Sequence, residues 1–156
     1  MSIPNDRKRL YELENGTVID HIPAGMAVKV LQVLGFDQNP ELILGIGTNF
    51  HSSKMGRKDV IKIENRDVTQ DELNKIAVFA PTASVNRIQG GIVVSKARVE
   101  VPAEFQSLLE CRNPNCITRF EKIETRFYAV EKNPLLLKCH HCEKNFEGKE
   151  AALLGR

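Results

Sequence analysis

The stretch Cys111-Arg-Asn-Pro-Asn-Cys116, followed after 22 residues by Cys139-His-His-Cys142, decides the fold of the second part of this chain. Each cysteine pair lies on a turn short enough to aim two thiolates at one ion. Zn²⁺ accepts four thiolates tetrahedrally at about 2.3 Å, and four thiolates leave no open position for a catalytic water. The spacing therefore predicts one structural zinc ion per chain, held by Cys111, Cys116, Cys139 and Cys142.

Two other interpretations of these residues stay open. Cys139 and Cys142 could form a redox dithiol, with the other pair incidental, because Cys-x-x-Cys is also a redox motif. His140 or His141 could replace one thiolate, because imidazole also binds zinc.

The cysteines also mark a change in organisation along the chain. Residues 1–102 contain none of the four, and Pro102 disfavours a continuous helix across the junction. We therefore expect one domain over residues 1–102 and a second over residues 103–156. A domain of about fifty residues is too small to depend on apolar burial alone, so a structural metal would stabilise it. We expect a zinc-ribbon-like β domain, with a strand hairpin over Ile117 to Val130.

The first hundred residues alternate between two hydrophobic periods. Runs rich in β-branched residues predict strands. Apolar residues at the spacing i, i+3, i+4, i+7 predict one helix, and the capping box Thr69-Gln-Asp-Glu72 predicts the start of a second helix. The predicted strands cover 16–22, 42–46, 59–64, 84–88 and 92–96, and the helices follow Pro23 and Thr69. The order β-α-β-β-α-β with one further strand predicts an α+β, ferredoxin-like fold, with two helices on one face of an antiparallel sheet.

Composition limits the classes of function. Hydrophobic residues make up 42% and charged residues 27%, as in ordinary globular chains. The net charge is +2, from 22 basic and 20 acidic residues, so a broad nucleic-acid-binding surface is not expected. No apolar run approaches the roughly 20 residues that span a bilayer. We expect a cytoplasmic protein with no membrane partner, in which any anion site is local.

Polar side chains interrupt the apolar strands of the first half. Lys62 stands between Ile61 and Ile63, so its side chain points to the opposite face of a pleated strand, and Lys96 closes another apolar run. These ammonium groups with His21 would suit a polyphosphate. The alternative is an ordinary solvated sheet face, with His21 as a structural residue. A zinc-ribbon nucleic-acid-binding protein and a stand-alone enzyme also remain possible.

Several segments together resemble one family over nearly the whole chain. They are Gly16-Thr-Val-Ile-Asp-His-Ile-Pro23, Met55-Gly-Arg-Lys-Asp-Val-Ile-Lys-Ile-Glu-Asn65, Ala83-Ser-Val-Asn-Arg-Ile88 and the four-cysteine pattern. This combination is similar to the regulatory chain of aspartate carbamoyltransferase. The resemblance implies a non-catalytic subunit in pyrimidine biosynthesis, whose first domain binds the effectors CTP, UTP and ATP.

The resemblance also implies roles for individual residues. Asp20 would face the ribose, Lys62 the ribose and phosphate region, and the triphosphate would meet His21, Asn86 and Lys96. An apolar set would line the base and sugar pocket: Leu13, Val18, Val60, Ile88 and Val93.

The same resemblance implies partners. Regulatory chains would pair through their first domains, and the zinc domain would contact catalytic chains through Asn113, Asn115 and Glu143. The implied assembly contains two catalytic trimers and three regulatory dimers.

Overall fold

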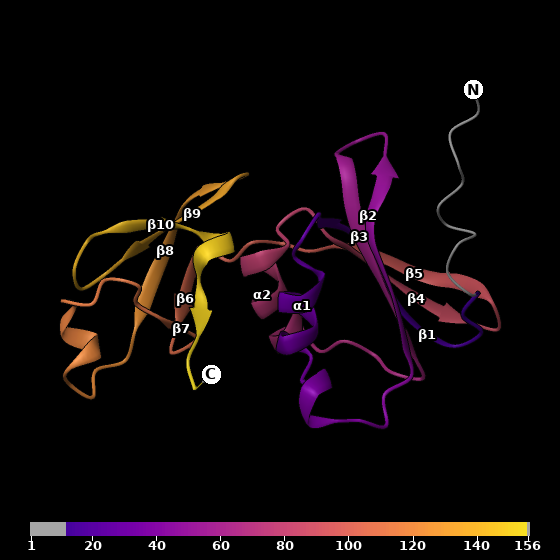
Figure 1. Cartoon of the computed structure of the whole chain (residues 1–156), viewed down its shortest axis with the longest axis horizontal. Helices are drawn as coiled ribbons and strands as arrows, with labels where there is room; N and C mark the ends of the chain where they lie inside the picture. The colour runs from indigo at the N-terminus through magenta and orange to yellow at the C-terminus, as the bar shows by residue number, and fades with distance from the viewer. Residues whose placement is uncertain (1–11, 156) are drawn as a thin grey trace.

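The computed structural model describes residues 12–155, which form a sheet with two helices followed by a smaller β part (Figure 1). The other residues, 1–11 and Arg156, fall within the ranges expected for the two domains and lie outside the described residues. We refer to residues 12–102 as the first part and 103–155 as the second part. In Figure 1 the two helices lie between the large sheet and the second part.

The first part is a five-stranded sheet in the order β2-β3-β1-β4-β5, in which every neighbouring pair is antiparallel. Two α-helices connect its strands, which confirms the predicted α+β fold of ferredoxin-like order. The strands are β1 Gly16–Pro23, β2 Leu44–Ser52, β3 Gly56–Glu64, β4 Ser84–Gln89 and β5 Ile92–Arg98, and the helices are α1 Ala27–Val33, α2 Gln70–Phe79 and the short 3-10 helix η2 Phe36–Gln38.

The helix boundaries follow from local sequence and one tertiary contact. The predicted capping box is present, since the Thr69 hydroxyl accepts from the Glu72 amide at 3.2 Å and the Glu72 carboxylate accepts from the Thr69 amide at 3.1 Å. Helix α1 lacks a side-chain cap of its own. Instead, the buried carboxylate of Asp59 on β3 accepts from the amides of Gly25 and Ala27 at 3.0 and 3.1 Å.

The sheet has one face covered by helices and one face turned away from them. Ile19, Ile61 and Ile63 are at most 1% exposed and share a core with residues of α1 and α2. Successive strand side chains point to opposite faces, so Val18 and Lys62 point away from the helices. We call this opposite side of the five-stranded sheet the open face.

The second part contains a four-stranded sheet, β10-β9-β8-β6, and a two-stranded ladder, β11-β7. Phe127 and Leu137 are fully buried at its centre. Its elements are β6 Glu104–Gln106, β7 Leu109–Glu110, β8 Arg126–Lys132, β9 Leu135–Cys139, β10 Asn145–Glu147 and β11 Ala152–Leu153, with 3-10 helices η3 Ile117–Arg119 and η4 Gly148–Glu150.

The expected hairpin over Ile117 to Val130 is wrong at its start. Residues 117–119 form a 3-10 turn directly after a cysteine, strand β8 begins only at Arg126, and its hairpin partner is β9. Phe120, which lies in that expected hairpin, is 72% exposed, whereas Phe127 of β8 is fully buried. The apolar residues of this segment are therefore buried only where strand β8 begins.

The two parts share one continuous core. Gly148, at the start of η4, permits close approach, because a Cβ there would lie 2.6 Å from the Val78 carbonyl oxygen and 2.8 Å from Leu135 Cδ2. Within residues 12–155, no helix is long and apolar enough to cross a membrane.

Candidate functional sites

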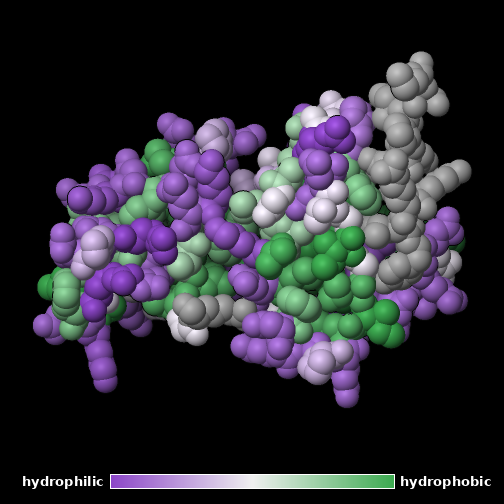
Figure 2. Space-filling view, in the orientation of Figure 1, coloured by the Kyte–Doolittle hydropathy of each residue, from purple (hydrophilic) through white to green (hydrophobic). Residues whose placement is uncertain are grey.

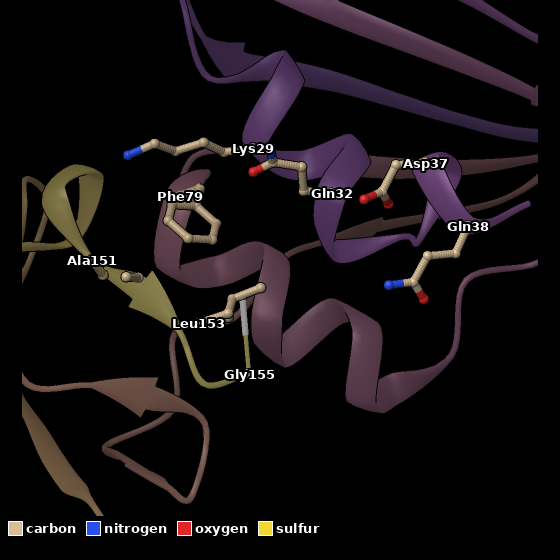
Figure 3. Close-up of a pocket in the computed structure, with 9 residues that line it drawn as sticks. Lys29, Gln32, Asp37, Gln38, Phe79, Ala151, Leu153 and Gly155 are labelled. Atoms are coloured by element: carbon tan, nitrogen blue, oxygen red, sulfur yellow. The ribbon is translucent and has the colours of Figure 1, made fainter. Parts of the chain in front are cut away.

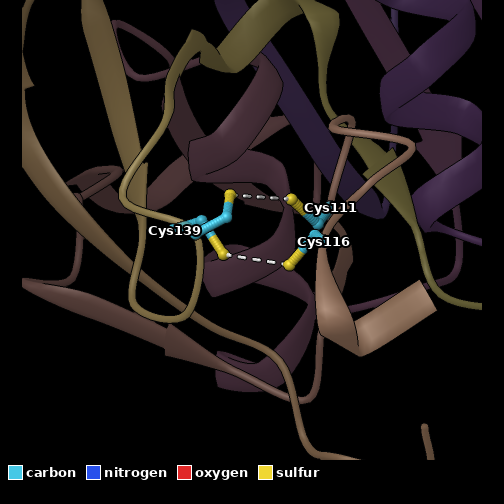
Figure 4. A group of neighbouring side chains, drawn as sticks. Cys111, Cys116 and Cys139 are labelled. Atoms are coloured by element: carbon cyan, nitrogen blue, oxygen red, sulfur yellow. Dashed lines mark hydrogen bonds between the residues drawn. The ribbon is translucent and has the colours of Figure 1, made fainter. Parts of the chain in front are cut away.

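The four cysteines converge from two turns at the ends of short strands. Cys111 follows β7, Cys116 precedes η3, Cys139 ends β9 and Cys142 lies in the next turn. Their four sulfurs all lie within 4.8 Å of one another. Two cross-turn pairs are Cys111 with Cys142 at 3.7 Å and Cys116 with Cys139 at 3.9 Å, marked by the dashed lines in Figure 4.

These distances fit a tetrahedral metal site. Four sulfurs at about 2.3 Å from a central Zn²⁺ would be about 3.8 Å apart, whereas a disulfide needs about 2.05 Å. All four cysteines are free thiols, and three are buried. The cluster can therefore hold one metal ion with a closed thiolate shell, as predicted for structural zinc.

Protonation of the thiols depends on the same burial. Burial raises the pKa of Cys139 and of Cys111, so both stay protonated at neutral pH until a cation compensates the thiolate charge. Cys142 also meets a burial penalty, but the backbone amide of Lys144 and the side chain of Asn113 lower its pKa to about 7. Metal binding to such a cluster releases protons and contributes to folding.

The neighbouring histidines point to other partners. His140 Nδ1 lies 2.7 Å from the Tyr128 hydroxyl, and His141 Nε2 lies 3.0 Å from the carbonyl oxygen of Glu124. Neither ring belongs to the sulfur cluster. The alternative in which an imidazole replaces a thiolate has no support in this geometry.

The predicted partner-contact residues lie on the same two turns. The Asn113 side chain accepts from the Asn115 amide at 3.1 Å, which rigidifies the first turn. Asn115 and Glu143 are exposed, and Asn113 is half-buried. Glu143 has a positive φ of 61°, and its amide donates to the Cys139 carbonyl at 2.9 Å. The cysteine cluster thus fixes both turns relative to each other.

The open face gathers most residues predicted for the nucleotide. Strand register places Lys62 opposite Val18, Val18 opposite Asn86, and Asn86 opposite Lys96, which makes one row across four strands. Directly opposite residues on one face lie within about 5.5 Å of each other. Within residues 12–155, the buried Asn86 Oδ1 has no hydrogen-bond partner.

An apolar row lies next to the polar one. Ile88 pairs with Gly16 on one side and with Val93 on the other, and the buried Leu13 reaches Gly16 from the preceding loop. Val93 is 54% exposed on the edge strand β5. The open face therefore has an apolar region beside its cationic row.

A bulge in β1 lies beside the polar row, on the side away from the apolar row. Asp20 and His21 together oppose Val60, and His21 adopts a positive φ of 57°. The His21 amide donates to Asp20 Oδ1 at 2.6 Å, and His21 Nδ1 lies 3.1 Å from the Ser84 hydroxyl. Such bulges and positive φ angles at non-glycine residues are frequent at functional sites.

Lys58 is the residue of this region that the sequence reasoning missed. Its ammonium lies 2.9 Å from Asp20 Oδ1, and both side chains are about nine-tenths buried (8% and 11% exposed). Burial alone would raise the pKa of Asp20, but Lys58 and the His21 amide together hold it below its ordinary value. Lys58, Val60 and Lys62 are spaced two residues apart along β3, so their side chains point to the same face of the sheet. This spacing was the sequence signal that could have identified Lys58.

Cations surround His21 at this end of the open face. Burial lowers the pKa of His21, and the charges of Lys58, Lys54 and Lys96 lower it further, against an opposing effect of Asp20. Burial also lowers the pKa of Lys62, while Glu12 and Asp20 act to raise it. An anion placed among these groups would gain Coulomb energy and reduce their mutual repulsion.

Comparison with known proteins gives a consistent family. Two family models match the chain, "Aspartate carbamoyltransferase regulatory chain, allosteric domain" over residues 9–100 and "Aspartate carbamoyltransferase regulatory chain, metal binding domain" over residues 103–152. Relatives named aspartate carbamoyltransferase regulatory chain include one from Pyrococcus horikoshii, 47% identical over 144 residues, 91% of this chain and 94% of the relative. Another, from Thermococcus sibiricus, is 47% identical over 139 residues, covering 89% and 91%. A third, from Methanocaldococcus jannaschii, is 39% identical over 142 residues, covering 91% and 94%.

The matches cover both parts of the fold, and the metal-binding model contains all four clustered cysteines. Neither a stand-alone enzyme nor a nucleic-acid-binding ribbon accounts for a match of this extent. The chain belongs to the family of aspartate carbamoyltransferase regulatory chains, and it is a non-catalytic subunit with an allosteric and a metal-binding domain.

Proposed function

We propose that residues 1–102 bind nucleoside triphosphate effectors on the open face, and that residues 103–156 transmit their effect to a catalytic chain. The effectors are CTP, UTP and ATP, and the regulated step is carbamoyl transfer to aspartate in pyrimidine biosynthesis. The observation that carries this proposal is the cross-strand row Lys62, Val18, Asn86 and Lys96, with the bulge at His21 beside it.

The open face offers the two chemistries that a nucleotide needs. His21 and Lys96 supply positive charge for the triphosphate, and Asp20 and Lys62 supply polar groups for the ribose. The neighbouring apolar row, with Ile88 and Val93, supplies surface for a base. The remaining members of the proposed site are Leu13, Val18, Val60 and Asn86.

Titration calorimetry of the full chain with CTP and with ATP tests this assignment. We expect saturable binding that weakens about tenfold or more in Lys96→Ala, because hydrogen bonds to charged groups contribute about 1.5–3 kcal/mol. Lys132→Ala, an exposed lysine on β8 of the second part, is the matched control. Equal affinity in the Lys96 variant and the control would remove Lys96 from the site.

The metal-held turns are the proposed contact with the catalytic chain. Asn113, Asn115 and Glu143 lie on loops that the sulfur cluster fixes, so little conformational entropy is lost when they bind. Mixing the chain with its catalytic partner and measuring the assembly mass, with and without zinc, tests this contact. Assembly that is indifferent to zinc removal would rule it out.

We further propose that the chain pairs with a second copy through β2 and α1. Strand β2 is an edge of the sheet, and apolar side chains are exposed beside it: Val28 at 59%, Ile43 at 60% and Ile46 at 39%. Figure 2 shows this apolar surface over α1 and the adjoining sheet edge. An unpaired edge beside an apolar patch favours pairing with a second copy by strand addition. Light scattering should report a dimer, and Ile46→Lys should yield monomers.

A further inference from the structure

Strand β3 connects the open face to helix α1 through two adjacent residues. Lys58 points to the open face and binds Asp20, while Asp59 points to the helices. The Asp59 carboxylate is fully buried and accepts from Gly25 and Ala27 at the start of α1. A displacement of β3 at Lys58 therefore moves the start of α1 as well.

The same carboxylate also fixes the neighbouring strand. Asp59 Oδ1 accepts from the Asn49 amide at 2.9 Å, and Asn49 lies with a positive φ of 58° in the bulge of β2. Hydrogen bonds to an ionised carboxylate are among the stronger ones in proteins. Helix α1 thus follows β3 and the β2 bulge as one unit.

Helix α1 also contacts the second part. The Lys29 ammonium donates to the backbone carbonyl of Lys149 in η4, and it lies 5.3 Å from the ring centroid of Phe79 on α2. Gly148, next to Lys149, packs without spare room against the Val78 carbonyl. Lys29 therefore connects a helix of the first part to the segment of the second part that packs most closely on α2.

A cavity of about 540 Å³ lies beside this contact (Figure 3). Gln32 on α1 and Leu153 on β11 line it from opposite sides. On this side, α1 and β11 face each other across open space and not through packed side chains. The Lys29 hydrogen bond and the η4 contact are therefore the links by which a shift of α1 would reach the second part.

We propose that α1 carries the effector signal from the open face to the metal-binding part, and that Lys29 is the positioning residue that couples them. Nucleotide bound near Asp20 and Lys58 shifts β3, Asp59 moves α1 with it, and Lys29 transfers the movement to η4. Coupling of this kind needs a difference in affinity between two arrangements, not tight binding alone. The inference rests on the proposed nucleotide function of the open face.

The test uses Lys29→Met, which keeps most of the aliphatic side chain and removes the ammonium that lies over Phe79. The control is Lys132→Met, an exposed lysine on β8. In complexes with the catalytic chain, we expect wild type and control to change activity with CTP or ATP. Lys29→Met should bind nucleotide with affinity within twofold of wild type while its activity response falls towards a ratio of one.

A second readout needs no catalytic chain. Hydrogen exchange of the amides of residues 148–151 in the full-length chain should change on adding CTP in wild type and stay unchanged in Lys29→Met. A full activity response in Lys29→Met, or wild-type exchange at 148–151 that ignores bound CTP, overturns the inference while leaving nucleotide binding intact. Absence of CTP binding by wild type overturns the proposed function itself, and the coupling with it.

Discussion

Replacing Lys58 by Met isolates the buried ion pair at the end of the open face. The change removes the ammonium 2.9 Å from Asp20 Oδ1 and keeps most of the aliphatic stem. Asp20 is then a buried carboxylate with the His21 amide as a remaining donor, at 2.6 Å. Breaking a buried pair by removing one partner costs about 3–5 kcal/mol, because the other charge stays buried. We expect about 3 kcal/mol here, at the lower end, because the His21 hydrogen bond persists.

The loss should depend on pH with a defined sign. In wild type the pKa of Asp20 is lowered, so the pair contributes stability above the ordinary aspartate pKa of 3.8 and loses it as pH falls through the native value. Without Lys58, burial dominates and the pKa of Asp20 rises. Protonation of Asp20 then stabilises the variant, so the difference in unfolding free energy from wild type should be largest at pH 7 and smaller at pH 5.5.

Urea unfolding of the zinc-loaded chain, followed by far-ultraviolet circular dichroism at pH 7 and pH 5.5 in the presence of zinc, measures both effects. For a chain of this size the loss corresponds to about 6–12 °C in Tm. Lys54→Met, at an exposed turn position, is the control and should change stability by less than about 0.5 kcal/mol. Adding Asp20→Asn to the Lys58 variant should recover most of the loss. A loss below about 1 kcal/mol at pH 7, or one that grows towards acid pH, would refute the reasoning.

Three further predictions follow from the two sites and their junction. Cys139→Ser should bind less than one equivalent of zinc and lose the circular-dichroism signal of the second part, and removing zinc from wild type with a chelator should cause the same loss of signal. A second part that stays folded without zinc would contradict the structural role of the metal. Gly148→Ala should lower the unfolding free energy by about 1–3 kcal/mol, because its Cβ would lie 2.6 Å from the Val78 carbonyl oxygen. Unchanged urea unfolding would contradict this prediction and show that the backbone near Val78 moves to accommodate the Cβ. A bound triphosphate should raise the lowered pKa of His21, so protonation of His21 should strengthen CTP binding as pH falls from 8 to 6. Calorimetry at constant ionic strength measures the affinity at each pH, and the gain at pH 6 should be smaller in His21→Gln than in wild type.

Local patterns were sufficient for much of the fold. The capping box at Thr69, the apolar face of α1 and the alternation around Lys62 each depend on residues a few positions apart, and the structure contains all three. The four thiolates were equally predictable, because short Cys-to-Cys spacing limits their geometry before any tertiary contact forms.

Contacts made through space were not predictable in the same way. Lys58 preceded the expected start of its strand, and its pairing with Asp20 depends on a bulge that sequence periodicity does not show. Likewise, the hydrogen bond from Lys29 to Lys149 joins residues 120 positions apart. The expectation that Phe120 lies in a strand hairpin was wrong for a local reason. It follows a metal-ligating turn, where an apolar residue can stay exposed.

The central claim is that the open face binds nucleotides and thereby regulates a catalytic chain. The most direct test is an activity titration of the zinc-loaded complex with CTP and ATP, run beside calorimetry of the same samples. The account predicts that the activity change saturates with the calorimetric isotherm, that Lys96→Ala shifts both together, and that the isolated chain transfers no carbamoyl group. Nucleotide binding without any change in activity, or an activity change that survives loss of binding in Lys96→Ala, would contradict it.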